Sequence, residues 1–230
     1  MRKLILSLLA LVAMGTAAQN VQLHYDFGHA NKNLKGRPAL TTTLEMFRPD
    51  QWGNTFFFVD LNHKEQGIES AYWEIAREIR LGKSDFSAHV EYNGGTFGPK
   101  SDAYLVGPSY SWNAADFQSG FSAMALYKHL AVAGGKSSYQ LTGTWYKYFA
   151  NGLFCFNGFI DIWHEYNRNT GKLYPVVLTE PQLWFNLNKL KGVDPAFNLS
   201  IGTECEISYN FPFENETFYA LPTLAVKWTF

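Results

Sequence analysis

The amino-acid sequence predicts an all-β fold, a closed antiparallel transmembrane β-barrel of about twelve strands, and three observations lead to it. Segments of about ten residues alternate between apolar and polar side chains and are separated by turn residues. The polar faces carry carboxylates, while Tyr and Trp recur near the segment ends, as in an interfacial girdle. The chain ends on Phe230, and a terminal Phe on the apolar face is typical of bacterial outer-membrane barrels that an assembly machinery recognises.

The composition of the 230 residues excludes several other classes of protein. Lys and Arg total 19 against 20 Asp and Glu, so the basic excess of a nucleic-acid binder is missing. Aromatic residues reach 17% and charged residues only 17%, which does not fit a disordered chain. Two Cys residues are too few for a disulfide scaffold. Mean hydropathy is −0.18, and no apolar run approaches the roughly 18 residues of a spanning helix.

The start of the chain predicts a secretory signal peptide over residues 1–18. Arg2 and Lys3 form a positive region, an apolar run follows, and small residues up to Ala18 form a cleavage site. The apolar run is too short for a retained membrane anchor. Because no Cys follows it, a lipoprotein anchor is not expected either. The mature protein is therefore expected to be one barrel domain over residues 19–230, exported to the bacterial outer membrane.

Twelve alternating segments can be assigned in the mature chain. They cover residues 21–28, 40–48, 54–63, 70–81, 86–93, 103–113, 117–129, 138–149, 153–165, 182–189, 197–210 and 217–230. An even number of strands places both termini on the same side of the membrane, the periplasmic side. No helix is expected beyond the signal peptide.

The two faces of each segment differ in polarity. In the last segment Leu224, Val226 and Phe230 share one face, and Thr223 and Lys227 share the other. A soluble sandwich or lipocalin would bury the apolar face, whereas a transmembrane barrel turns it to lipid. The carboxylates on the polar faces and the segment lengths favour the barrel, and a secreted soluble β-protein is the alternative. In lipid an open sheet edge cannot be satisfied by water, so the first and last strands must pair.

Arg77 does not fit this alternation. It shares a face with Trp73, Ile75 and Ile79, which would place it in lipid. A β-bulge near Ala76 would re-aim it, because one extra residue reverses the face on which later side chains lie.

Several stretches, taken in order, resemble one family. They are FFFVDL (56–61), YWEI (72–75), FID (159–161), TEPQLWF (179–185), IGTE (201–204) and VKWTF (226–230). This set resembles the nucleoside-specific channel-forming outer-membrane proteins, the Tsx-like family, over nearly the whole mature chain. The resemblance implies a monomeric twelve-stranded barrel with a narrow pore for nucleosides. The chain departs from the family pattern at residues 76–78, where a Pro and then a basic residue are expected.

The inward faces supply candidate groups for binding a nucleoside. Aromatic faces can stack on a base, and carboxylates and amides can bond to ribose hydroxyls. Alternation places suitable side chains in the lumen, and the expected substrate-binding residues are Phe56, Phe58, Asp60, Glu74, Asp161, Trp184, Asn186 and Glu204. The alternative for each of them is that it only solvates the lumen or pairs with a neighbour, for example Asp60 with Arg80.

Rival functions find weaker support in the sequence. A lipid-acting outer-membrane enzyme needs a Ser and His on the outer wall, and Ser87 and His89 share the inward face with Glu91 instead. No nucleophile or metal motif occurs, so no enzyme activity, cofactor or metal is expected. Cys155 faces inward and Cys205 outward, so a disulfide is not expected. The expected partners are nucleosides or similar small solutes, outer-membrane lipids and the barrel assembly machinery, with no nucleic acid. A non-selective or purely structural barrel is the remaining alternative.

Overall fold

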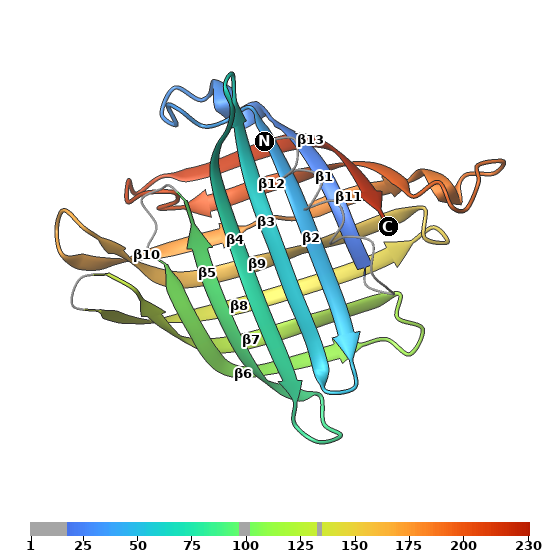
Figure 1. Ribbon diagram of the computed structural model, residues 1–230, viewed down its shortest axis with the longest axis horizontal. Coiled ribbons are helices and arrows are strands. Elements are labelled where there is room, and N and C mark those ends of the chain that lie inside the picture. The colour runs from blue at the N-terminus through green and yellow to red at the C-terminus, as the bar shows by residue number, and fades with distance from the viewer. Residues whose placement is uncertain (1–17, 97–101, 133–134) are drawn as a thin grey trace.

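The computed structural model describes residues 18–96, 102–132 and 135–230, which form one continuous antiparallel sheet (Figure 1). Its strands are β1 (Ala18–Asp26), β2 (Leu40–Asp50), β3 (Gly53–Lys64), β4 (Gly67–Arg80), β5 (Phe86–Gly95), β6 (Ala103–Asn113), β7 (Ser119–Leu130), β8 (Lys136–Phe149), β9 (Phe154–Asn167), β10 (Lys172–Thr179), β11 (Gln182–Asn186), β12 (Leu199–Tyr209) and β13 (Phe218–Thr229). The predicted signal peptide lies outside the described residues except for Ala18, which begins β1.

The sheet closes on itself between its first and last strands. β1 pairs with β13 from Asn20 opposite Thr229 to Asp26 opposite Thr223. The N–H of Phe230 then donates to the carbonyl of Gln19 at 2.9 Å. The closed antiparallel barrel is therefore confirmed, and its wall has no open edge, which is the arrangement that a bilayer requires.

β10 and β11 are two halves of one strand, which makes twelve strands in all. Thr179 lies opposite Ile160, and Gln182 lies opposite Asn157, so the register along β9 is unbroken. The interruption falls at Pro181, which has no N–H to donate to the neighbouring strand. Its carbonyl still accepts from the N–H of Cys205 at 3.0 Å.

The sequence-based assignment of this tenth strand was wrong in its limits. The strand begins at Lys172 rather than residue 182, and Leu187–Lys189 is a turn of 3-10 helix. The first half was missed because Tyr174 and Val176 point inward and are buried, while Val177 lies on the opposite face. With apolar residues on both faces, the polar–apolar alternation disappears.

Elsewhere the outer face is apolar, and the inner face is mostly polar apart from patches such as Ala103, Leu105, Leu126 and Leu130. In β13 Leu224 and Val226 are 55% and 42% exposed, whereas Thr223 and Ala225 are 8% and 2% exposed. A sandwich would bury the first pair, so this burial pattern excludes it. Exposed apolar residues continue around the wall, among them Leu23, Tyr25, Ile75, Ile79, Val90, Val106, Phe121, Leu141, Phe156, Ile160, Ile162, Leu183, Ile201 and Ile207.

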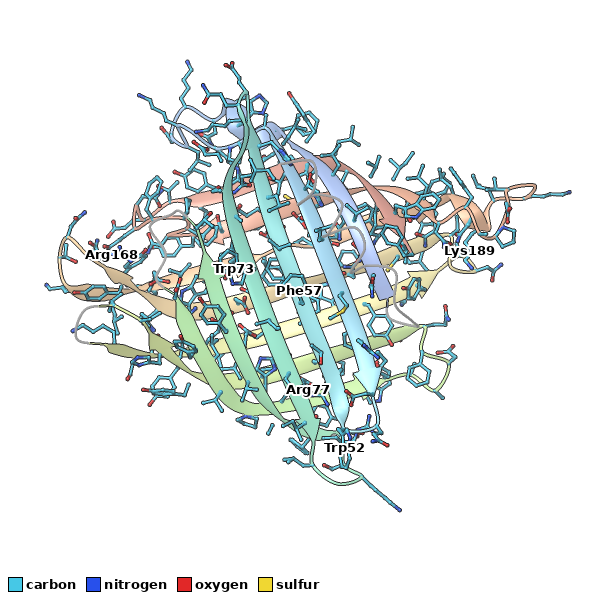
Figure 2. The ribbon with its side chains drawn as sticks, viewed as in Figure 1. Trp52, Phe57, Trp73, Arg77, Arg168 and Lys189 are labelled. Atoms are coloured by element: carbon cyan, nitrogen blue, oxygen red, sulfur yellow. The ribbon has the colours of Figure 1, made fainter. Side chains whose placement is uncertain are left out.

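The bulge predicted near Ala76 does not occur. Residues 70–79 of β4 pair with β3 in one unbroken register, and the irregularity in this pair lies at Asn62/His63. Arg77 therefore stays on the outer face, where it donates to both carboxylate oxygens of Asp50, at 2.7 and 2.9 Å. Figure 2 shows Arg77 closer than Trp73 to the strand ends near Trp52. Its charge is thus tolerated because it lies near the rim and is paired.

The two ends of the barrel differ in their connections. The terminal end, where β1 begins and β13 finishes, carries the turn at Trp52 and the segment between β11 and β12. The opposite end, here called the loop end, carries residues 27–39, 168–171 and 210–217, and Arg168 and Lys189 mark the two ends in Figure 2. The helices found in the described chain are the 3-10 turns Phe27–Ala30 and Leu187–Lys189, and neither is long or apolar enough to cross a membrane.

Candidate functional site

The lumen is lined by every second residue of each strand, and most of these side chains are polar. Buried examples are Gln22, His24, Glu78, His89, Lys128, Gln140, Glu165, Glu206 and Ser208. Several carboxylates keep some accessible surface, and the side chain of Glu204 is 19% exposed. Since alternation along a strand puts these groups on one face, the closed sheet collects them around a single central space.

Three inward-facing aromatic rings form a ladder on β3 and β4. The ring centroids of Phe56 and Phe58 are 6.0 Å apart, and those of Phe58 and Tyr72 are 5.9 Å apart. The hydroxyl of Tyr72 donates to Glu74 at 2.6 Å, and Asp60 accepts from the hydroxyl of Thr43 at 2.5 Å. The structure therefore brings together four of the predicted site residues, Phe56, Phe58, Asp60 and Glu74.

A first acidic cluster consists of Glu74 on β4, Glu91 on β5 and Asp161 on β9. The carboxylate of Glu74 is repelled electrostatically by both Glu91 and Asp161, although β4 and β9 are not neighbours in the sheet. The repulsion therefore acts across the lumen. Asp161 also accepts from Thr142 at 2.5 Å.

A second acidic cluster consists of Glu204 and Glu206 on β12, Asp60 on β3 and Glu45 on β2. Glu204 is repelled by the other three carboxylates of this cluster. It accepts from the amide of Gln182 at 2.5 Å. The second acidic cluster thus joins two parts of the wall that lie on either side of the seam between β13 and β1.

Trp184 and Asn186 do not form an open platform. Trp184 is fully buried, and the ammonium of Lys227 lies 3.9 Å from the centroid of its ring. The face of Trp184 is therefore occupied by a side chain of the protein itself. Asn186 donates to the carbonyl of Gly152 at 2.8 Å and accepts from Ser200 at 2.7 Å, which holds it at the terminal end.

Several lumen groups were absent from the predicted site. His89 lies 2.9 Å from Glu91 and 3.4 Å from Glu78, so it links two carboxylates on β4 and β5. Lys128 donates to Gln140 at 2.8 Å. Alternation already places His89, Lys128 and Lys227 on inward faces, so the same signal would have found them.

The segment between β1 and β2, residues 27–39, reaches into the loop end of the barrel. Leu34 is buried against Tyr219 and Leu221, two inward-facing residues of β13. Arg37 donates to Asp26 at 2.6 Å and to Glu206 at 2.7 Å. Burial opposes the charge on Arg37, but the two carboxylates outweigh it and raise the pKa of its guanidinium above the ordinary value. These contacts fix the segment as a partial cover of that mouth.

The described residues do not form a metal centre. Within residues 18–96, 102–132 and 135–230, no group of three or more His, Cys, Asp or Glu side chains is placed to hold a metal ion. Cys155 and Cys205 are both free thiols, as expected from their opposite faces. Ser87 and His89 are buried on the inner face, so they do not present a Ser–His pair to lipid.

These features define a fold, a closed antiparallel β-barrel, that solved outer-membrane porins share. The chain is similar to the solved structure of NanC porin, with a TM-score of 0.58 and 15% identity over 92% of this chain and 99% of that chain. It is also similar to KdgM porin, with a TM-score of 0.51 and 10% identity over 93% of this chain and 99% of that chain. At these identities the likeness shows the fold.

By sequence, the chain belongs to the family described as a domain of unknown function, DUF5020, which matches residues 18–230. A comparison with curated proteins gives no match. The comparisons therefore give no support to membership of the Tsx-like family, which the ordered motifs resemble.

Proposed function

We propose that this protein is a porin-like channel through which small solutes diffuse across the bacterial outer membrane. The observation that carries the proposal is the closed wall, apolar outside, around a lumen lined by polar and charged side chains. Inward carboxylates, amides and hydroxyls suit a lumen that water and small solutes enter. The proposal includes export by the signal peptide over residues 1–18, insertion by the barrel assembly machinery, and function as a monomer without a cofactor.

We further propose nucleosides as the solutes. The ladder of Phe56, Phe58 and Tyr72 offers aromatic faces to a base, and stacking on such faces is worth about 1–3 kcal/mol per base in nucleic-acid sites. Asp60 and Glu74 lie beside the same rings and can accept from ribose hydroxyls through charge-assisted hydrogen bonds. Because the rings and the two carboxylates lie side by side, they can contact the base and the ribose of one nucleoside together, which supports this binding face.

Swelling of liposomes that contain the purified protein tests both levels of the proposal. Swelling in nucleosides that exceeds swelling in free sugars of similar size supports a nucleoside channel. Equal rates for the two classes would contradict nucleoside selectivity and leave a general porin. Liposomes that swell in neither class, while the protein is folded, would contradict the channel itself and favour a structural role.

A further inference from the structure

We propose that the lumen selects by charge, so that neutral and cationic solutes pass and anions are excluded. This inference rests on the proposed channel function and adds the charge class of its solutes. It is independent of whether the solutes are nucleosides, because it depends on the electrostatic potential of the lumen rather than on the aromatic ladder.

The first support is the balance of charges that face the lumen. In the described strands, inward carboxylates belong to Asp26, Glu45, Asp60, Glu74, Glu78, Glu91, Asp161, Glu165, Glu204 and Glu206. The cations that face the lumen are fewer. Lys128, Lys227 and the loop residue Arg37 lie within it, and Arg80, Lys136 and Lys172 lie at strand ends. A low-dielectric wall concentrates the resulting field within the pore.

The second support is where these charges gather. The first acidic cluster, Glu74, Glu91 and Asp161, acts across the lumen between the walls of β4, β5 and β9. The second acidic cluster faces the lumen near β12, β2 and β3. Asp and Glu rings are the device by which cation channels select. An anion moving along this lumen therefore meets carboxylates from several directions.

The third support is an unsatisfied acceptor beside the first acidic cluster. Asn93 is 5% exposed, and its Oδ1 has no hydrogen-bond partner among the described residues. It lies directly opposite Glu74 and two residues from Glu91, on the same inward face. Since Glu74 and Glu91 beside it are acceptors too, a donor group or a cation is needed to satisfy it. An ammonium group, a hydroxyl or K⁺ can do so, whereas a carboxylate or a chloride ion cannot.

The lysines in the lumen offset this potential only in part. Lys128 is attracted by Glu74, Glu91 and Asp161, and Lys227 by Glu45 and Glu204, without direct ion pairs. The ammonium of Lys128 lies 4.6 Å from the ring centroid of Trp163, and that of Lys227 lies 3.9 Å from the ring centroid of Trp184. Cation–π contacts hold both ammonium groups against the wall. In the part of the chain that the structure describes, neither lysine forms an ion pair with a carboxylate. His89 contacts Glu91 of the first acidic cluster and also Glu78. A single imidazole therefore faces two carboxylates and can neutralise at most one of them.

Reversal potentials in planar bilayers under a KCl gradient test the inference. We expect a preference for K⁺ over Cl⁻ of about tenfold, in line with the effect of charged clefts on ion concentration. The triple variant Glu74→Gln, Glu91→Gln, Asp161→Asn removes the first acidic cluster with nearly isosteric side chains, and the preference should fall towards unity. Glu65→Gln, in the exposed turn after β3, is the matched control and should keep the preference.

The outcomes separate this inference from the channel proposal. Conductance without a preference for K⁺ in the unaltered protein would overturn charge selection and leave the channel standing. A preference that survives in the folded triple variant would overturn the role of the first acidic cluster. If the triple variant does not assemble, the single variant Glu74→Gln must lower the preference, and no change would overturn the inference. A folded barrel without any conductance would overturn the channel and this inference together.

Discussion

At the scale of single residues, Asp60 is a carboxylate that bonds to the wall of the barrel and also belongs to the proposed binding face. Its side chain points into the lumen beside Phe58, two positions away on the same face of β3, about 6.6 Å along the strand. It accepts a hydrogen bond from Thr43 on the neighbouring strand and takes part in the repulsion that surrounds Glu204. A carboxylate has several acceptor sites, so it can accept from more than one hydroxyl at a time.

We expect Asp60→Ala to lower nucleoside flux while leaving small-ion conductance much less affected. The reason is the loss of a charge-assisted hydrogen bond, which is worth about 1.5–3 kcal/mol and corresponds to roughly a tenfold or greater loss of occupancy. On the same variant, nucleoside flux is measured by liposome swelling and ion conductance in planar bilayers. Asp85→Ala, in the exposed turn after β4, is the control and should change neither. A parallel fall of flux and conductance would remove Asp60 from the binding face and make it a residue that only shapes the pore.

At the scale of elements, the segment of residues 27–39 turns inward from the barrel wall and packs on inward-facing residues of β12 and β13. Its apolar anchor is Leu34, packed on β13, and its polar anchor is Arg37, which joins the end of β1 to β12. The Arg37 side chain is only 18% exposed, and its two partners are less exposed still. The planar guanidinium can bond to two carboxylates at once, which an ammonium group does less well.

We expect Arg37→Gln to release this segment from the mouth of the barrel. The variant leaves Asp26 and Glu206 buried without their cation, and breaking a buried ion pair in this way costs about 3–5 kcal/mol. Trypsin should then cut faster after Lys32 and Lys35, and single-channel conductance should rise. Arg37→Lys keeps the charge but not the fork, so it should give an intermediate result. Unchanged digestion and conductance in Arg37→Gln would show that Leu34 alone holds the segment.

At the scale of the whole molecule, stability depends on the seam between β1 and β13. When β10 and β11 are counted as one strand, every other pair consists of strands that follow one another in the chain. The pair β1–β13 instead joins the two ends of the described sequence. The seam ends at Phe230, whose ring is 55% exposed and whose N–H bonds to Gln19. If export follows the proposed route, this exposed ring is where the assembly machinery would contact the last strand.

We expect deletion of Phe230 to reduce the amount of folded protein in the outer membrane. Two effects add, because the deletion removes both the terminal aromatic and one hydrogen bond of the seam. Folded protein is quantified by its altered mobility on unboiled gels. Phe218→Ala, at the other end of β13 and 70% exposed, is the matched control and should assemble normally. Equal amounts of folded protein in the deletion and the control would contradict a role for Phe230 in assembly.

The alternation along each strand, and with it the inside and outside of the barrel, was determined by the sequence alone. A period of two residues is a local property, so it places Phe58, Asp60 and Lys227 in the lumen without knowledge of any distant residue. It missed the first half of β10, where both faces are apolar. At Arg77 alternation gave the correct outer face, and the bulge proposed to re-aim this residue was wrong, because Asp50 pairs with it there.

The meeting of particular side chains was decided only by the tertiary structure. Glu74 and Asp161 lie 87 positions apart in the chain and on strands that do not pair, yet they repel each other across the lumen. Lys227 likewise covers the ring of Trp184, and Arg37 reaches Glu206, although the partners in each contact are far apart in the chain. Which groups face one another across a barrel depends on the register of every strand pair and on closure at the seam. That is a property of all the pairings together, so no local pattern in the sequence contains it.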